Sequence, residues 1–372
     1  MPLHRRGAGA PRHQCRAKTE VRRETLRRRN PMKTSANLKR RSMAWLAIAT
    51  LGLAAAGGAR AEVEELKMMS QYGIGYMQLT LLKEQKLLEK HLAGNGLGKT
   101  RVTWARMGAG AAANDALLSG NLHFAAGGTG PALILWDRTR ANVDVRGVAA
   151  LSSMPNLLIT RNSAVKTIRD FTDKDRIAMA GAGSSVQTTY LQMATAKEFG
   201  IENYRKLAPL MVNLPHPEGL RALLAGGSEI TSQFTSPPFQ NQALETQGVR
   251  VVLNSYDVMG GPNTFLMIWA AKKFRDENPK TYKAVMDALR EATASINADK
   301  RAAAELYVKE GGGKDSADKI LAIMNDPQIR YTLAPERILP YAQFMHQVGT
   351  LKTRPASWKD MFFQDIHDLP GS

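Results

Sequence analysis

Three short segments of the form Gly-x-Gly each separate a strand-like apolar stretch from a helix-like stretch. They are Gly73-Ile74-Gly75, Gly108-Ala109-Gly110 and Gly181-Ala182-Gly183. Glycine lets backbone amides approach a small molecule closely. The start of a helix adds unpaired N–H groups and a partial positive charge. Loops of this kind therefore suit an anion or strongly polar atoms.

Hydroxyl side chains stand at or beside the starts of the predicted helices. They belong to Thr129, Ser184, Ser185, Thr235 and Ser236. A hydroxyl at this position either caps the helix or binds a ligand, and the sequence leaves both roles open for each residue.

The middle loop, in GAGAAA, also matches the dinucleotide fingerprint G-x-G-x-x-A. A dinucleotide fold needs that loop after its first strand and an acidic residue at the end of the following strand. Here the loop follows the second predicted strand, and the next strand carries His123 but no carboxylate. We therefore expect no nucleotide cofactor.

The residue types of metal and covalent catalysis are sparse beyond residue 61. The five histidines there are His91, His123, His216, His346 and His367, and no two have the spacing of a metal-binding pair on a helix. The one cysteine, Cys15, lies earlier, and no G-x-S-x-G motif occurs. We expect neither a metal site nor catalytic residues. For His216, where a loop enters a helix, capping, solvent contact and ligand contact all stay open.

The elements that would hold these loops alternate between strand and helix. Strands are expected at residues 65–72, 100–107, 121–128, 145–151, 156–161, 176–181, 207–212, 229–234, 249–255 and 263–274. Helices are expected at residues 77–92, 111–120, 130–139, 184–200, 216–227 and 237–248. This alternation predicts parallel sheets covered by helices. From Glu277 onward the pattern is helical, so this strandless tail must pack on a sheet formed earlier.

The chain contains two similar segments of equal length. They are ALLSGNLHFAAGGTGPA at 116–132 and ALLAGGSEITSQFTSPP at 222–238. The copies align without a gap, pairing Gly120 with Gly226, Thr129 with Thr235 and Pro131 with Pro237. The repeat predicts two lobes of one plan that face each other across a cleft. We expect lobe I at 62–152 and 265–372 and lobe II at 153–264, joined by two Gly- or Pro-containing hinges.

The first 61 residues have a different character. Residues 32–61 have the basic start, apolar run and Ala59-Arg60-Ala61 cleavage site of a secretory signal peptide. The apolar run is shorter than the ~20 residues of a membrane span. Arg40-Arg41 leaves twin-arginine export open beside general secretion. We interpret residues 1–31 as an extension from a wrongly assigned start, with a basic disordered tail as the alternative.

The strongly basic charge belongs largely to this leader. Fifteen of the 51 Lys and Arg residues and two of the 33 Asp and Glu residues precede residue 62, so the remainder carries 36 against 31, a net charge of +5. Nucleic-acid binding is not indicated, because it needs a clustered basic face. The expected product is exported to the periplasm, free of cysteine and monomeric.

Four segments, at residues 70–91, 114–133, 165–181 and 274–292, carry a family resemblance. With them the chain resembles periplasmic solute-binding proteins of ABC importers, of the nitrate, sulfonate and taurine type, whose fold is shared with thiamine-precursor binding proteins. The resemblance implies a type II periplasmic-binding-protein-like fold, with two α/β lobes that close on a small molecule. It also implies delivery of that molecule to a membrane permease with its ATPase. Where the family often has an acidic residue, this chain has His123.

Carried over by position, the resemblance implies a set of ligand contacts at helix starts and hinges. They are Gly75, Tyr76, Gly110, Thr129, Gly130, Ser153, Asn156, Ser184, Ser185, Thr235 and Asn263. The function expected is reversible capture of a small anion or polar organic molecule. The alternative is an enzyme on the same fold that acts on a pyrimidine-like precursor.

Overall fold

The computed structural model describes residues 62–225, 227–311 and 315–372. The predicted extension 1–31, the predicted signal peptide 32–61 and Gly226 of the second repeat copy lie outside the described residues.

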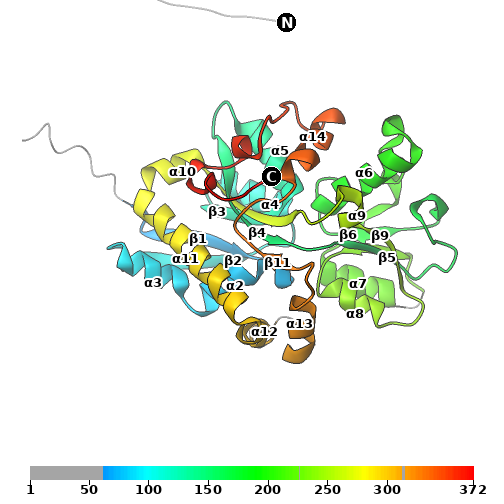
Figure 1. Ribbon diagram of the computed structural model, residues 1–372, viewed down its shortest axis with the longest axis horizontal. Coiled ribbons are helices and arrows are strands. Elements are labelled where there is room, and N and C mark those ends of the chain that lie inside the picture. The colour runs from blue at the N-terminus through cyan, green and yellow to red at the C-terminus, as the bar shows by residue number, and fades with distance from the viewer. Residues whose placement is uncertain (1–61, 226, 312–314) are drawn as a thin grey trace, which may run out of the picture. The chain divides into compact units, whose positions relative to one another are not determined.

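The first sheet, which defines lobe I, has the strand order β11-β4-β10-β3 (Figure 1). Its strands are β3 (Phe124–Gly128), β4 (Val145–Ser153), β10 (Thr264–Ala271) and β11 (Arg330–Tyr331). The parallel pair β1 (Glu65–Ser70) and β2 (Arg101–Arg106) extends it, because the N–H of His123 just before β3 donates to the carbonyl of Lys67 in β1 at 2.9 Å.

The second sheet, which defines lobe II, has the strand order β7-β6-β8-β5-β9. Its strands are β5 (Leu157–Thr160), β6 (Ile177–Met179), β7 (Met211–Asn213), β8 (Ser232–Thr235) and β9 (Arg250–Asn254). Its helices are α6 (Val186–Phe199), α7 (His216–Leu224), α8 (Phe239–Leu244) and α9 (Ser255–Met259). Figure 1 draws this lobe in green, beside the blue, cyan and yellow elements of lobe I.

The chain passes between the sheets twice, from β4 to β5 and from β9 through α9 to β10. At the first crossing, the end of β4 pairs with the start of β10, Ser153 opposite Thr264. In lobe II, the start of β5 lies opposite the ends of β8 and β9, with Leu157 paired to Thr235 and Asn254. The carboxyl ends of β3, β4, β8 and β9 are therefore all directed to the region between the lobes.

The two-lobed α/β architecture is confirmed, but the sheets are mixed rather than parallel. β10 runs antiparallel to β3 and β4, and β5 runs antiparallel to β8 and β9, whereas β6 is parallel to β7 and β8. The cause is the crossing itself. A strand that arrives from the other lobe begins beside the carboxyl ends of the strands already in the sheet, and it therefore runs antiparallel to them.

The single helix expected at 77–92 is two helices, α2 (Met77–Glu84) and α3 (Leu87–Gly94). Lys86 between them has a left-handed backbone, with φ of 53°, which interrupts the helical hydrogen bonds. The other lobe I helices before the crossing are α4 (Gly110–Leu118) and α5 (Thr129–Thr139).

The C-terminal tail packs on lobe I, as predicted. Its helices are α10 (Lys272–Glu277), α11 (Pro279–Ala298), α12 (Lys300–Lys309), α13 (Ala317–Met324) and α14 (Ile338–Gln347). The long helix α11 buries Val285, Leu289 and Ile296 completely and lies along α2 and α3. The tail is not strandless, because its two-residue strand β11 pairs with the end of β4.

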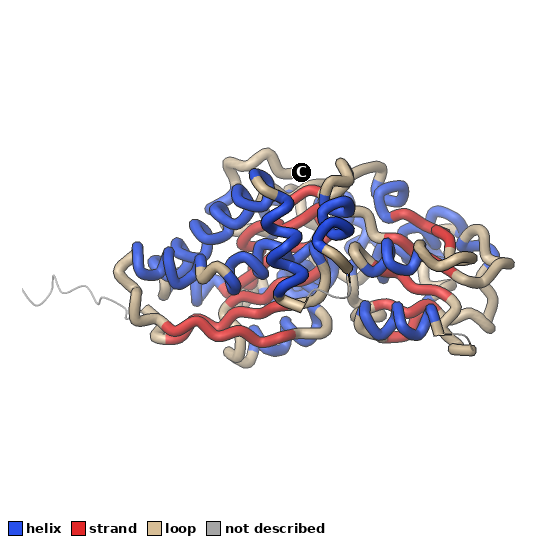
Figure 2. Tube along the Cα trace, turned by 90° about the horizontal axis from the view of Figure 1, so that it is seen from below, coloured by secondary structure: helices blue, strands red, loops and turns tan. Residues whose placement is uncertain are grey.

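The core of lobe I is formed between the sheet and these helices, and Figure 2 shows the helices stacked over the strands of the sheet. Trp136 of α5 and Trp269 of β10 are among its largest fully buried side chains. No helix in the described ranges combines the length and the apolar character needed to cross a membrane.

Candidate functional site

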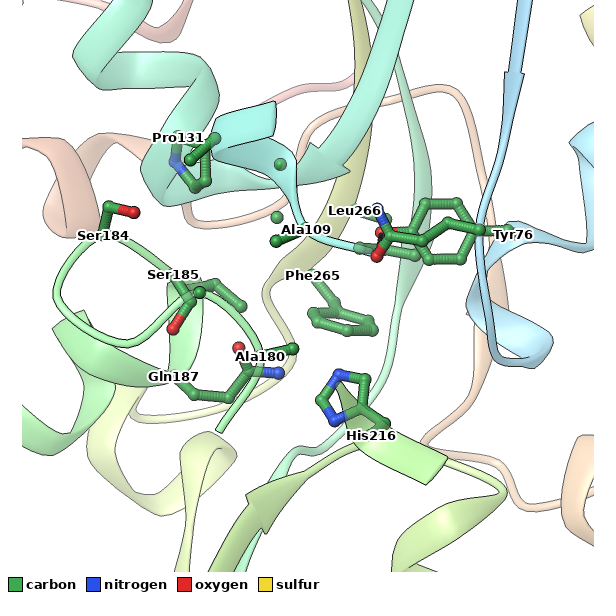
Figure 3. A pocket seen from close by; sticks show the side chains of 16 residues that line it. Tyr76, Ala109, Pro131, Ala180, Ser184, Ser185, Gln187, His216, Phe265 and Leu266 are labelled. Atoms are coloured by element: carbon green, nitrogen blue, oxygen red, sulfur yellow. Dashed lines mark hydrogen bonds between the residues drawn. The ribbon is translucent and has the colours of Figure 1, made fainter. Parts of the chain in front are cut away.

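A small cavity of about 30 Å³ lies where the two lobes meet (Figure 3). Lobe I contributes the end of β1, the starts of α4 and α5, and the first residues of β10. Lobe II contributes the loop after β6 and the start of α7. The lining residues are Gln71, Tyr76, Ala109, Gly110, Ala111, Gly128, Pro131, Ala180, Gly181, Ser184, Ser185, Val186, Gln187, His216, Phe265 and Leu266.

Four helices, α4, α5, α6 and α7, begin at this cavity. In α4, α5 and α7 the residue before the helix makes no side-chain capping bond, so N–H groups of the first turn are left for another acceptor. In α6 the hydroxyl of Ser185 accepts from the N–H of Thr188 at 3.2 Å. Each helix start contributes about half a positive charge. Of the described residues that line the cavity, none is Asp, Glu, Lys or Arg, so the cavity favours an anion.

The end of β1 adds a side-chain donor. The hydroxyl of Tyr76 donates to Oε1 of Gln71 at 2.7 Å, which fixes the orientation of the amide. Nε2 of Gln71 is then buried and has no hydrogen-bond partner among the described residues. Burial raises the pKa of Tyr76 far above its ordinary value, so its hydroxyl stays protonated. The pair therefore presents an N–H donor and no charge.

The start of α7 adds His216, which Figure 3 shows below Phe265 and near Ala180. Nδ1 of His216 lies 2.9 Å from Oγ1 of Thr235 in β8, and the ring stacks on Phe239 at 5.7 Å between centroids. Burial lowers the pKa of His216 to about 4, so the ring is neutral near pH 7.

Behind the cavity lies a buried amide network that ties α6 to the crossings. Nε2 of Gln187 donates to Oδ1 of Asn156 at 2.7 Å, and the N–H of Asn156 donates to the hydroxyl of Ser255 at 2.9 Å. Nδ2 of Asn263 donates to the hydroxyl of Tyr190 in α6. Asn156 and Asn263 therefore hold the crossings and do not line the cavity.

The structure brings Tyr76, Gly110, Ser184 and Ser185 of the predicted set to the cavity wall. The other predicted residues are not among those that line the cavity. Gly75 packs against the crossing, where its carbonyl accepts from the Ser152 hydroxyl at 3.0 Å, and Ser153 is fully buried at the end of β4.

Thr129 and Gly130 lie in the first turn of α5, where lobe I meets lobe II. The Thr129 hydroxyl is buried beside that of Tyr341, without the geometry of a hydrogen bond. Burial raises the pKa of Tyr341, and the hydroxyls of Thr189 and Thr129 offset part of that rise. A Cβ built on Gly130 would lie 2.8 Å from the carbonyl oxygen of Ser184. These positions are contacts between the lobes.

The two threonines of the repeat therefore lie in different structural positions. Thr129 is the first residue of α5, whereas Thr235 is the last residue of β8 and bonds to His216. The hydroxyl of Thr235 therefore contacts a histidine that lines the cavity, and the direct contact of Thr235 with a ligand stays a prediction.

Sequence reasoning missed Gln71, Gln187 and Phe265 as lining residues. A signal existed for Gln71, because it directly follows β1, and the carboxyl ends of strands are where ligands bind in such sheets. Phe265 gave no such signal, since its apolar stretch is typical of any core strand. His123 is structural: its Nδ1 accepts from the N–H of Lys67 at 3.2 Å, and its ring stacks on Phe274. In the described ranges, no cluster of three or more His, Cys, Asp or Glu could hold a metal ion.

Two larger grooves flank the cavity along the boundary between the lobes. One, of about 790 Å³, lies between α12 of lobe I and α7 and α8 of lobe II, and it shares Gln71 with the cavity. The other, of about 710 Å³, lies between α4 and α5 on one side and α6 on the other. Between them the lobes touch directly, because a Cβ on Gly128 would lie 3.0 Å from Cβ of Val186.

The tail also reaches across to lobe II on both sides. Nζ of Lys319 in α13 lies 2.6 Å from a carboxylate oxygen of Glu245, just after α8. On the opposite side the hydroxyl of Tyr204 donates to the carbonyl of Val348 at 3.2 Å. These contacts join the lobes on both sides of the cavity.

Two mixed-sheet lobes, joined by crossing segments and closed over a cavity of helix starts, define the class of two-lobed periplasmic-binding-protein folds. Solved structures share this fold. The alkanesulfonate-binding protein SsuA of Xanthomonas axonopodis pv. citri, bound to MOPS, matches with a TM-score of 0.61 and 19% identity, over 79% of this chain and 96% of that one. The periplasmic nitrate-binding protein NrtA of Synechocystis PCC 6803 matches with a TM-score of 0.60 and 14% identity, over 81% and 84%. The model of the NMT1-like family matches residues 59–309, and the chain belongs to that family. No curated protein sequence matches it significantly.

Proposed function

We propose that this protein is the periplasmic substrate-binding component of an ABC importer and reversibly captures a small organic or inorganic anion between its lobes. The observation that carries the proposal is the convergence of four helix starts and the unpartnered Nε2 of Gln71 on one cavity without acidic side chains. Such a site binds negative charge through oriented N–H groups and needs no cation.

The proposal includes the route of the ligand. The mature chain would begin at Glu62, after export and removal of the segment 32–61. The crossings near residues 153–156 and 255–264 would act as hinges between lobe I and lobe II, and closure would present both lobes to a permease. The fold that the chain shares with SsuA, described as sulfonate-binding, and NrtA, described as nitrate-binding, supports this route and an oxyanion as the ligand.

The lining residues favour binding over catalysis. The titratable side chains among them are Tyr76 and His216. The hydroxyl of Tyr76 donates to Gln71, and Nδ1 of His216 is occupied by Thr235. This arrangement offers no pair of groups that could exchange a proton with a substrate from opposite sides, so the enzyme alternative has no observation in its favour.

A thermal-shift screen of the mature chain from Glu62 tests the proposal. The probes are methanesulfonate, taurine, nitrate, aliphatic carboxylates and pyrimidines. A ligand at a hundredfold excess over its Kd adds about 2.7 kcal/mol to the free energy of unfolding, which raises Tm by several degrees. A rise with the oxyanions supports the proposal, whereas a rise with the pyrimidines alone would contradict it.

A further inference from the structure

The cavity adjoins a much larger groove, the α7 groove, which lies between α12 and α13 of lobe I and α7 and α8 of lobe II (Figure 1). The cavity, of about 30 Å³, has room for about two water-sized groups. This space matches the charged end of a small anion but not a carbon chain. The α7 groove, of about 790 Å³, has the size of pockets that hold small organic molecules.

Gln71 marks the junction of the two spaces, because its side chain lines both. Its Nε2 is buried and has no hydrogen-bond partner among the described residues. An anion held by this donor therefore has the α7 groove directly beside it.

Helix α7 runs from the cavity along the groove. Its first residue, His216, lines the cavity, whereas Pro217, Leu220 and Leu224 line the groove. The spacing of three and four residues places these three side chains in one row on the helix. At 1.5 Å per residue, the distance along α7 from His216 to Leu224 is about 12 Å. An extended carbon chain advances about 1.2 Å per bond, so this length suits a charged end followed by about eight carbons.

The other walls of the α7 groove are aromatic. Lobe I contributes Tyr72 and Tyr307, and lobe II contributes Phe239 at the start of α8. Tyr72 and Leu224 are 37% and 39% exposed, which is unusual for large apolar side chains in this protein. An apolar chain between the walls would remove both side chains from water.

The acidic side chains of the α7 groove are paired with bases. The ion pairs are Glu310 with Lys83, and Glu245 and Asp315 with Lys319. Arg221 of α7 is exposed and adds a positive charge. The groove therefore does not repel an anion that enters it.

The second groove, between α4 and α5 on one side and α6 on the other, is less suited to a carbon chain. It adjoins the cavity at Ala111, Pro131 and Ser184. Its lobe II wall is polar, because α6 contributes Thr189 and Gln192. An apolar chain gains less from burial against such a wall.

We propose that the captured anion carries an unbranched apolar chain of about eight carbons, which lies in the α7 groove while the charged end is held at Gln71 and the helix starts. This inference rests on the proposed function and specifies the organic part of its ligand. Affinity should increase about two- to fourfold with each methylene group that is buried. The increase should stop once the chain extends beyond Leu224.

The test is calorimetric titration of the mature chain at pH 7 with methanesulfonate, butanesulfonate, octanesulfonate and dodecanesulfonate. All four carry the same charged end, so they differ only in chain length. We expect octanesulfonate to bind at least about a hundredfold more tightly than methanesulfonate, and dodecanesulfonate to bind little more tightly than octanesulfonate.

Two leucine variants locate the chain. Leu224→Asn places an amide at an exposed position of the α7 groove, and we expect the ratio of octanesulfonate to methanesulfonate affinity to fall severalfold. Leu118→Asn is the matched control, because Leu118 is also exposed but lines the second groove, and this variant should keep the ratio of the wild type.

Three results would overturn the inference and leave the proposed function standing. One is equal affinity of the wild type for methanesulfonate and octanesulfonate. The others are a ratio that Leu224→Asn does not change, and a ratio that falls in Leu118→Asn instead. Failure of the wild type to bind any of the four sulfonates or nitrate would overturn both the inference and the proposed function.

Discussion

Gly130 offers a direct way to test whether the contact between the lobes forms when a ligand is captured. It lies in the first turn of α5, and a Cβ there would lie 2.8 Å from the carbonyl oxygen of Ser184, 3.0 Å from the hydroxyl of Tyr341 and 3.2 Å from the carbonyl carbon of Ser185. Ser184 and Ser185 belong to lobe II, and the atoms nearest to the new Cβ include backbone atoms that no rotamer change can move. In Gly130→Ala, lobe closure must therefore stop a few tenths of an ångström short or strain the loop before α6.

The magnitude follows from the cost of overpacking. Forcing one methyl group into a well-packed contact costs about 1–3 kcal/mol, which corresponds to binding about 5- to 150-fold weaker. The hydroxyl of Tyr341 belongs to α14 of lobe I, so the methyl group meets it whether or not lobe II closes. Alanine is also about 0.5–1 kcal/mol better than glycine within a helix. In the empty protein this gain and the tight contact with Tyr341 act in opposite directions, so the Tm should change little.

The assay is calorimetric titration of methanesulfonate, with the Tm of the empty protein measured alongside. Gly108→Ala is the matched control, since it lies in the loop before α4 and a Cβ there meets nothing within 4 Å. The reasoning is refuted if Gly130→Ala binds as tightly as the wild type.

Three further substitutions test other parts of the structure. Thr129→Val removes a buried hydroxyl without a hydrogen-bond partner, so the Tm of the empty protein should stay within about 2 °C in a thermal melt; a drop in methanesulfonate affinity would mean that the hydroxyl contacts the ligand. Gly147→Ala places a Cβ against the ring of Phe362, and we expect the free energy of unfolding measured in urea to fall by about 1–3 kcal/mol. An unchanged urea midpoint would contradict this packing. Burial alone would raise the pKa of Asp175. The hydrogen bonds that its carboxylate accepts, first among them the one from the backbone N–H of Thr172, have the larger effect and lower the pKa. The stability from Asp175 is therefore present above the unfolded value near 3.8 and is lost as pH falls through the folded pKa. Asp175→Asn should cost about 1–3 kcal/mol at pH 7 and flatten the acid dependence of urea unfolding, and an unaltered dependence would exclude Asp175 as a source of it.

The sequence was informative about which segments are strands and which are helices, because burial imposes the periods of two and 3.6 residues on each segment separately. It was not informative about strand direction. The apolar stretch 263–274 has the same pattern whether its strand runs parallel or antiparallel to its neighbours, so the antiparallel direction of β10 was not predicted. The break at Lys86 was hidden for a related reason, since the leucines on both sides continue one apolar face.

The candidate site was only partly predictable. Tyr76, Gly110, Ser184 and Ser185 were found because the start of a helix after a strand is a local property. The role of Thr235 depends on His216, which lies far from it in space until α7 and β8 pack together. Both residues could be singled out in the sequence, but the hydrogen bond between them could not be predicted from it.

The position of β10 in the lobe I sheet also determines the order in which the two lobes can fold. β10 lies between β3 and β4, so Leu266 is paired with Gly128 on one side and Ser152 on the other. The strands of lobe II, from residue 157 to residue 254, all precede it in the chain. During synthesis, lobe II can complete its sheet while lobe I still lacks its middle strand. Insertion of β10 pairs it with two strands that lie far back in the sequence, on the other side of all of lobe II, and we expect this insertion to be a slow step of folding.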